Sequence, residues 1–457
     1  MNYIFAIALL LYLIVFIVIG ILDLKNIKSF TDYSVAGKKQ SSLSVVMTLL
    51  ATVVGASTTI GITTTVYSIG FPGIWWLAFG AVGLILQSVF LSEKVREIGA
   101  DTLPDLAGKI IGRPAEIIIS LIIVISWVGV IAGQLVAMNS LITFALGRSN
   151  RLIFIIVSVI VIAYTAIGGQ MSVVKTDKVQ LIIILVGVTV CMGYLYLTRG
   201  ENNAEVLRNV ELLNDNYKVS NLFTQFFVIG GVYFLGPDIM SRNFIAKDGK
   251  SAKSAAWTAG IALLVFSVII TFIGMWIRYN VTPEEMGDMG ALMYAVSIMP
   301  KWAAILLIFG LLSAILSSTD TCIINASTIF VKDILKKESV NGVRITVIVI
   351  GLTAMLLAVL GQGDIMSLLT GAYSIYTPGV IFPLMVAIFA YQRRGIHTEI
   401  WIAAVTAGGM FGILGTYFGS VLTKIGVPDG IMNYLTLIGM GISLVLSLVS
   451  VKRKEVS

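Results

Sequence analysis

Long apolar stretches alternate with short polar ones along almost the whole chain. A run of about 20 apolar residues crosses the hydrocarbon core of a bilayer as a helix. The pattern therefore predicts an all-α integral membrane protein with about 13 transmembrane helices, by the length rule for spans. The predicted spans cover residues 3–22, 43–70, 73–96, 115–146, 151–168, 173–198, 221–240, 252–278, 301–331, 342–360, 365–390, 398–420 and 430–450.

Composition supports a membrane protein and narrows its chemistry. Hydrophobic residues make up 57% of the chain and charged residues 12%, whereas a soluble domain carries roughly 25% charged residues. Cys191 and Cys322 both lie in apolar segments, and the single histidine, His397, lies in a polar loop. These positions argue against a disulfide framework, a histidine-based metal centre and a catalytic triad.

The distribution of positive charge predicts the topology. The first span has no basic residue before it and Lys25 and Lys28 behind it, which indicates an uncleaved anchor with its N-terminus outside. With that orientation, most of the 31 Lys and Arg residues fall on the inner side. We therefore expect a multi-pass protein of the plasma (inner) membrane with a cytoplasmic C-terminus. The net charge of +7 follows from this topology, so the lipid bilayer is the expected partner and nucleic acid is not.

The ninth predicted span carries polar groups at its centre. Residues 310–333 read GLLSAILSSTDTCIINASTIFVKD, and several hydroxyls fall with Asp320 on one half of the helix. Hydroxyl and carboxylate oxygens suit a hard cation. An equally good interpretation is that the hydroxyls bond to carbonyls one turn earlier and that Asp320 caps a neighbouring helix.

Small residues and a proline interrupt two of the spans. Gly55-Ala56-Ser57-Thr58-Thr59 interrupts the second span, and Gly230-Gly231 together with Gly236-Pro237-Asp238 interrupts the seventh. Paired breaks of this kind predict the binding site of an inverted-repeat transporter. Glycines that only pack helices together are the alternative, because the chain has 44 of them.

The breaks suggest a division of the chain into two matching halves. We expect a five-plus-five inverted repeat in which the first and sixth core helices are broken. The segments are an N-terminal anchor helix and cytoplasmic loop (1–42), the first repeat with core helices 1–5 (43–198), an extracellular loop (199–220), the second repeat with core helices 6–10 (221–390), and two C-terminal helices with a basic tail (391–457).

Three motifs together resemble one known family. The stretch TAIGGQMSVVKTDKVQ (165–180) is similar to the signature of the sodium:solute symporter family. Ser317-Ser318-Thr319-Asp320-Thr321 resembles that family's Ser-Thr-Ala-Asp-Ser helix, and Tyr233-Phe234-Leu235-Gly236-Pro237 resembles its seventh span. The likeness runs from about Asp32 to Arg394.

The resemblance implies a leucine-transporter-type fold that couples sodium influx to solute uptake by alternating access. It maps a sodium site onto the carbonyl oxygens of Ala56, Thr59 and Ala314 and the hydroxyls of Ser317 and Ser318. Physical chemistry supports this mapping, because an unwound helix frees carbonyls and small residues let two backbones approach closely. Some members of the family carry a second cation site, which here corresponds to Asp177, Ser317, Asp320 and Thr321.

The solute pocket is expected between the two breaks. Aromatic walls with a few polar groups are typical of small-molecule sites. The solute is predicted to be small and organic, either amino-acid-like, a carboxylate or similar. The third and fourth spans have no arginine at mid-depth, which argues against strongly anionic sugars such as sialic acid. The candidate residues are Ser57, Thr58, Ile60, Gln87, Trp127, Gln134, Tyr233, Phe234 and Tyr376.

Several alternatives stay open beside the sodium-coupled symporter. One is a transporter-like membrane sensor, and another is a proton-coupled symporter that uses Asp320. A membrane-embedded enzyme is not expected, because the acidic residues other than Asp177 and Asp320 lie mostly near span ends. The sequence indicates no particular oligomeric state.

Overall fold

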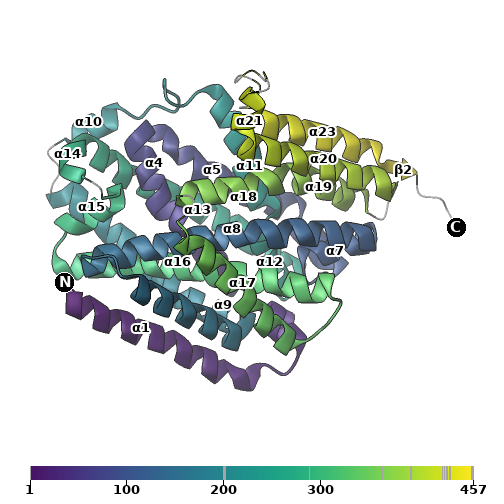
Figure 1. Ribbon diagram of the computed structural model, residues 1–457, viewed down its shortest axis with the longest axis horizontal. Helices are drawn as coiled ribbons and strands as arrows, with labels where there is room; N and C mark the ends of the chain where they lie inside the picture. The colour runs from purple at the N-terminus through teal and green to yellow at the C-terminus, as the bar shows by residue number, and fades with distance from the viewer. Residues whose placement is uncertain are drawn as a thin grey trace.

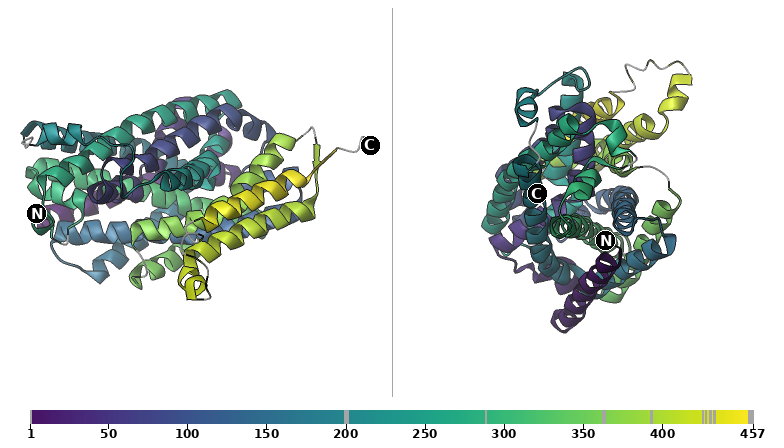
Figure 2. Two further views of the ribbon diagram at one scale, coloured as in Figure 1. Left: turned by 90° about the horizontal axis from the view of Figure 1, so that it is seen from above. Right: turned by 90° about the vertical axis from the view of Figure 1, so that its left-hand side faces the viewer.

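The computed structural model describes residues 2–198, 202–287, 289–361, 364–391, 394–424, 426, 428, 431 and 434–453. Helices make up most of this part, and the longer ones run roughly along the long axis of the molecule (Figure 1 and Figure 2). In Figure 1 and in the right-hand view of Figure 2, α1 lies at one edge, and α20 and α23 lie at the opposite edge.

The first half of the described chain contains ten helices. They are α1 (Asn2–Asp23), α2 (Phe30–Val35), α3 (Ser42–Val53), α4 (Ile62–Ile69), α5 (Trp75–Phe90), α6 (Ser92–Ile98), α7 (Leu103–Ile110), α8 (Arg113–Leu146), α9 (Arg151–Thr198) and α10 (Asn203–Arg208).

The second half contains the remaining elements. The helices are α11 (Val219–Leu235), α12 (Pro237–Ile245), α13 (Gly249–Asn280), α14 (Pro283–Met286), α15 (Ala291–Ile298), α16 (Lys301–Ile329), α17 (Val340–Val359), α18 (Ile365–Tyr376), α19 (Phe382–Ala390), α20 (Thr398–Tyr417), α21 (Gly419–Lys424) and α23 (Leu435–Val449). Strands β1 (Arg394–Ile396) and β2 (Val451–Arg453) pair antiparallel and join the ends of α20 and α23.

The structure confirms a multi-pass membrane protein. Within the described residues, ten helices are long and apolar enough to cross a bilayer, and the bent pair Ser42–Val53 and Ser57–Ile69 brings the number to eleven. Helix α9 has 48 residues, a length of about 72 Å against a hydrocarbon core of about 30 Å. Gly169 interrupts α9 with a positive φ of 58°, at the boundary between two of the predicted spans. The total of about 13 and the five-plus-five repeat stay predictions.

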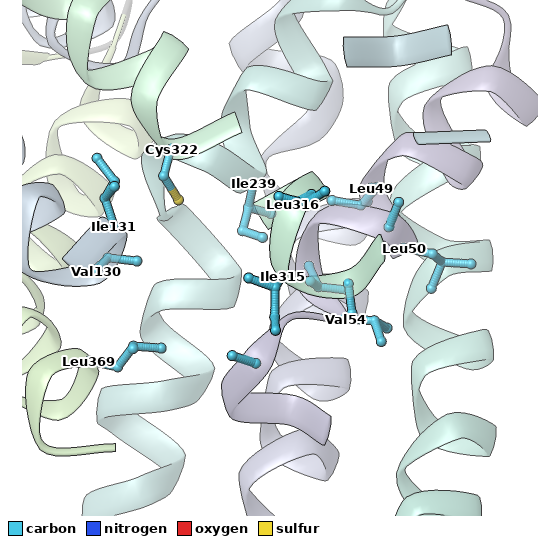
Figure 3. Close-up of a cluster of buried hydrophobic side chains, with 14 of the residues drawn as sticks. Leu49, Leu50, Val54, Val130, Ile131, Ile239, Ile315, Leu316, Cys322 and Leu369 are labelled. Atoms are coloured by element: carbon cyan, nitrogen blue, oxygen red, sulfur yellow. The ribbon is translucent and has the colours of Figure 1, made fainter. Parts of the chain in front are cut away.

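Helix α16 lies at the centre of the molecule. Every residue from 310 to 329 is buried, and 78% of its most apolar stretch is buried against 28% for α1. Figure 3 shows apolar side chains of α3, α8, α12 and α18 gathered around Ile315 and Leu316 of α16. Because protein surrounds α16 on all sides, its polar groups contact other side chains and backbone rather than lipid.

Both predicted helix breaks are present, and the second is shorter than predicted. Helix α3 ends at Val53, and the chain resumes as a π-helical turn over Ser57–Gly61 at a bend of 61°. Helix α11 ends at Leu235, and an extended Gly236 (φ −68°, ψ 146°) precedes Pro237, the first residue of α12. The prediction that Gly230-Gly231 also interrupts this span is wrong, because both residues lie inside the continuous helix α11.

Candidate functional site

The first break is stabilised by side chains that replace the missing helical hydrogen bonds. The backbone N–H of Ala56 donates to Gln134 Oε1 at 3.1 Å, so it does not reach the carbonyl of Thr52. That carbonyl instead accepts a hydrogen bond from the Ser318 hydroxyl of α16 at 2.8 Å. Because buried backbone groups must be paired, these side chains keep the unwound segment stable at membrane depth.

Glycine at position 55 permits the close contact between α16 and the break. A Cβ atom at Gly55 would lie 2.5 Å from Ser318 Oγ, a distance that real Cβ atoms do not adopt. Thr58 and Thr59 brace the same segment from within, since the Thr58 hydroxyl accepts from Gly55 N–H at 2.8 Å and the Thr59 hydroxyl donates to the Gly55 carbonyl at 2.8 Å. Thr58, a predicted solute contact, therefore supports the break itself.

The second break is stabilised in the same way. Pro237 has no N–H, so it cannot make the helical bond to the carbonyl of Tyr233. The Gln87 amide donates to the carbonyl of Phe234 at 3.2 Å, and the Tyr376 hydroxyl donates to the carbonyl of Leu235 at 2.5 Å. Gln87 and Tyr376, both predicted solute contacts, thus stabilise the break through hydrogen bonds. Trp127 packs edge-on against Tyr376 with ring centroids 5.1 Å apart.

A small cavity lies between the two breaks. Its volume of about 20 Å³ leaves room for about one water molecule. Ser57, Gln134 and Tyr233 line it, as predicted for solute contacts, and so does Ser318. The other lining residues are Thr52, Val53, Gly55, Val130, Val232, Asp238, Ile239, Cys322, Leu369 and Tyr373.

Two predicted solute contacts line other hollows. Ile60 lines a pocket of about 380 Å³ that also contains Asp364 and Met366. Phe234 lines an apolar groove of about 310 Å³. The structure therefore brings Ser57, Gln134 and Tyr233 together at one cavity, and the remaining candidates do not line it.

The residues mapped to a sodium site lie on both sides of the contact between α16 and the first break. Ala56, Thr59, Ala314, Ser317 and Ser318 are all buried, with at most 4% exposure. The Thr59 carbonyl accepts hydrogen bonds from the Thr63 hydroxyl at 2.9 Å and from the backbone N–H of Ile62. A hydroxyl that donates its hydrogen keeps its lone pairs, so Ser317 and Ser318 can still coordinate an ion.

Asp177 of α9 lies beside this region and is paired with a buried arginine. Its carboxylate accepts hydrogen bonds from Ser317 at 2.6 Å, from Thr48, and from Arg242 of α12 at 3.2 Å. Arg242 is 1% exposed, and the same guanidinium nitrogen also donates to the hydroxyls of Thr52 and Thr321. A positive charge from the protein thus already lies against Asp177.

Asp320 faces a different set of partners. Its two carboxylate oxygens accept hydrogen bonds from the Tyr164 hydroxyl at 2.8 Å and the Thr165 hydroxyl at 2.6 Å, both in the first part of α9. The four residues expected in a second cation site therefore do not converge on one point here. Asp177 contacts Ser317, Arg242 connects Asp177 to Thr321, and Asp320 lies apart.

Sequence reasoning missed three residues at this site. Arg242 follows the predicted span 221–240 in the sequence, yet it is buried and pairs with Asp177. Asp238 and Tyr373 line the central cavity. A signal for the first two was visible, because Asp238 and Arg242 are spaced one helical turn apart directly after the break.

Solved structures with a similar fold include a sodium-coupled symporter. A substrate-bound, outward-open sodium-coupled sialic acid symporter superposes with a TM-score of 0.79 at 16% identity, covering 99% of this chain and 100% of that one. MHP1, a nucleobase-cation-symport-1 family transporter, has a TM-score of 0.59 at 15% identity and covers 91% and 93%. MhsT in complex with L-phenylalanine has a TM-score of 0.57 at 13% identity and covers 90% and 98%.

These likenesses establish the fold that the chain shares with the three solved structures. The class of protein, a transporter rather than an enzyme, follows from a family match. The model of the sodium:solute symporter family matches residues 33–395, which is most of the chain. The chain belongs to the sodium:solute symporter family.

Proposed function

We propose that this protein imports a small organic solute, amino-acid-like, a carboxylate or similar, by alternating access driven by sodium. Membership of the sodium:solute symporter family supports sodium-coupled symport. The class of solute is our proposal. The solute would bind at the cavity between the breaks, where Ser57, Gln134 and Tyr233 meet. In the conformation described, this cavity is too small for any organic solute, so it must widen on binding.

The contact of Ser318 with the first break is the observation that supports a sodium site there. Ser318 bonds the carbonyl of Thr52 at 2.8 Å, which places α16 directly against unwound backbone. Carbonyls of Ala56, Thr59 and Ala314 with the hydroxyls of Ser317 and Ser318 would form an uncharged cage. Such a cage can hold a monovalent cation weakly enough to release it, as transport requires.

A second cation would bind where Asp177 meets Ser317. The Ser317 hydroxyl donates to the Asp177 carboxylate at 2.6 Å. Arg242 donates hydrogen bonds to both Asp177 and Thr321, so it links Thr321 to this pair. Because the Arg242 guanidinium now neutralises Asp177, a second cation would have to replace it. Asp320 would join this site only after leaving Tyr164 and Thr165.

Thermal unfolding of the purified protein tests the proposed function. A ligand that binds the folded state stabilises it by mass action, so transported solutes should raise the melting temperature in sodium chloride and not in potassium chloride. Ser318→Ala should remove the effect of sodium while the protein stays folded. A solute that stabilises equally in both salts, or an unchanged sodium effect in Ser318→Ala, would contradict the proposal.

A further inference from the structure

Asp238 is a charged residue in the wall of the central cavity. It is the second residue of α12, directly after the break at Gly236. Its side chain is 9% exposed, and its Oδ1 atom has no hydrogen-bond partner. Among the described residues that line the cavity, Asp238 is the one with a formal charge.

The unpaired oxygen distinguishes Asp238 from the other carboxylates at this depth. Asp177 has Arg242 and two hydroxyls, and both oxygens of Asp320 accept from hydroxyls. A buried carboxylate oxygen without a partner is costly, because it has lost its hydration. Arg242 lies one turn further along the same helix, but its Nη2 atom donates to Asp177 and Thr52, and its Nη1 atom donates to Ser241.

The surroundings of Asp238 suit an organic cation. Tyr233 and Tyr373 line the same cavity, and aromatic faces attract ammonium groups that have lost their water. A second carboxylate, Asp364, lines the larger pocket beside Ile60 and is exposed. Two acidic groups, one exposed and one in the cavity, favour the approach of a cation over that of an anion.

We propose that the solute carries a positively charged ammonium group and that Asp238 binds this group between Tyr233 and Tyr373. The inference rests on the proposed function, because it assigns the solute to the same cavity. It narrows the solute class to amines and zwitterions, and it excludes solutes whose only charge is a carboxylate.

Charge-selective labelling of the cavity tests the proposal without knowledge of the solute. Ser57→Cys, which lines the cavity, is made in a background with Cys191 and Cys322 replaced by serine. It is labelled with an ammonium-bearing and a sulfonate-bearing methanethiosulfonate, and each rate is divided by the rate with free mercaptoethanol. We expect the ammonium reagent to react at least about tenfold faster, because a nearby unscreened carboxylate attracts it.

Variants of Asp238 separate charge from structure. Asp238→Asn and Asp238→Ser should remove the preference for the ammonium reagent, whereas Asp238→Glu should keep it. Asp215→Asn, an exposed aspartate of the outer loop, is the matched control and should change nothing. If Asp238→Asn keeps the same preference for the ammonium reagent as the parent protein with Asp238, the proposal is overturned.

A second arm uses defined compounds in sodium chloride. Choline and L-proline are compared with the isosteres that carry carbon in place of nitrogen, and the change in melting temperature is recorded. An isostere that stabilises the wild-type protein and Asp238→Asn equally well would overturn the ammonium assignment. A cysteine at position 57 that reacts with neither reagent would instead contradict the proposed function, because no aqueous pathway would reach the cavity.

Discussion

Asp177 and Asp320 are both fully buried next to α16, yet their partners differ in kind. Asp177 is paired with the guanidinium of Arg242 as well as with hydroxyls, whereas the oxygens of Asp320 accept from Tyr164 and Thr165. Among the described residues, no basic side chain forms an ion pair with Asp320. One face of α16 therefore lies against a buried charge pair formed by α9 and α12. The other face contains a carboxylate held only by neutral donors.

The position of Arg242 explains why this difference matters for transport. Arg242 belongs to α12, the helix after the second break, and it contacts Thr52 of α3, the helix before the first break. One guanidinium thus connects both broken helices with Asp177 of α9. Any motion that separates these helices must break the ion pair.

The largest expected effect is the loss of Arg242. Arg242→Gln leaves the Asp177 carboxylate buried and unpaired, so the free energy of unfolding should fall by about 3–5 kcal/mol. Asp177→Asn in the same protein should restore much of the loss, because it removes the unpaired charge. Chemical unfolding in detergent measures both, with Arg208→Gln of the exposed helix α10 as control. Equal stability of Arg242→Gln and wild type would refute the importance of the ion pair.

The next prediction concerns the number of cations moved per solute. The contacts predict that Asp177→Asn lowers the sodium:solute ratio, because Asp177 lies against Ser317 at 2.6 Å. Asp320→Asn should keep the ratio, since Asp320 faces Tyr164 and Thr165. Charge counting in proteoliposomes decides between them. A lower ratio in Asp320→Asn would show that Asp320 enters the second cation site, as the spacing of the motif predicts.

A smaller effect is expected when one donor to Asp320 is removed. Tyr164→Phe leaves one carboxylate oxygen without its hydrogen bond, which should cost about 1–3 kcal/mol of unfolding free energy. Tyr434→Phe, at an exposed position with 43% of its surface free, should cost much less. If the two variants are equally stable, the hydroxyl of Tyr164 does not support the buried carboxylate.

The smallest effect is expected for a charged cluster near the surface. Asp101, between α6 and α7, pairs with Lys38 and with Lys332. Burial raises the pKa of Asp101, but hydrogen bonds and charges from Lys332 and Lys38 outweigh it and hold the pKa below its usual value of 3.8. Its contribution is therefore complete above that value and is lost as the pH falls through the lowered pKa. Ion pairs at a protein surface are typically worth about 0.2–1 kcal/mol each.

Melting temperatures measured between about pH 6 and pH 3 test this contribution, since the usual aspartate pKa of 3.8 falls inside that range. The wild-type curve should fall towards that of Asp101→Asn at the acidic end. Parallel curves over the whole range would contradict the assignment.

Sequence patterns predict the helix breaks better than they predict side-chain partners. Pro237 removes a backbone donor wherever it lies, so the break before it is fixed locally. Glycine only permits a bend, and Gly230-Gly231 therefore remain helical where α11 packs against other helices. The hydroxyls that hold Asp320 come from residues 164 and 165, a pairing that only tertiary packing brings about.

The same limit applies to the cavity. Ser57, Gln134 and Tyr233 were predictable, because they lie near the breaks in sequence or at matching depth. Gln87 and Tyr376 have the same depth and chemistry but bond freed carbonyls instead. Which of two polar residues faces the cavity depends on helix rotation, which the spacing of apolar residues defines poorly in helices buried on every side.

Equilibrium binding of radioactive sodium to the purified protein tests the central claim most directly, because it requires no knowledge of the solute. We predict saturable binding to the wild-type protein that is lost in Ser318→Ala and retained in Ser297→Ala, whose hydroxyl bonds only its own helix α15. Absence of saturable binding in the wild-type protein, or unchanged binding in Ser318→Ala, would contradict a sodium site at the contact between α16 and the first break.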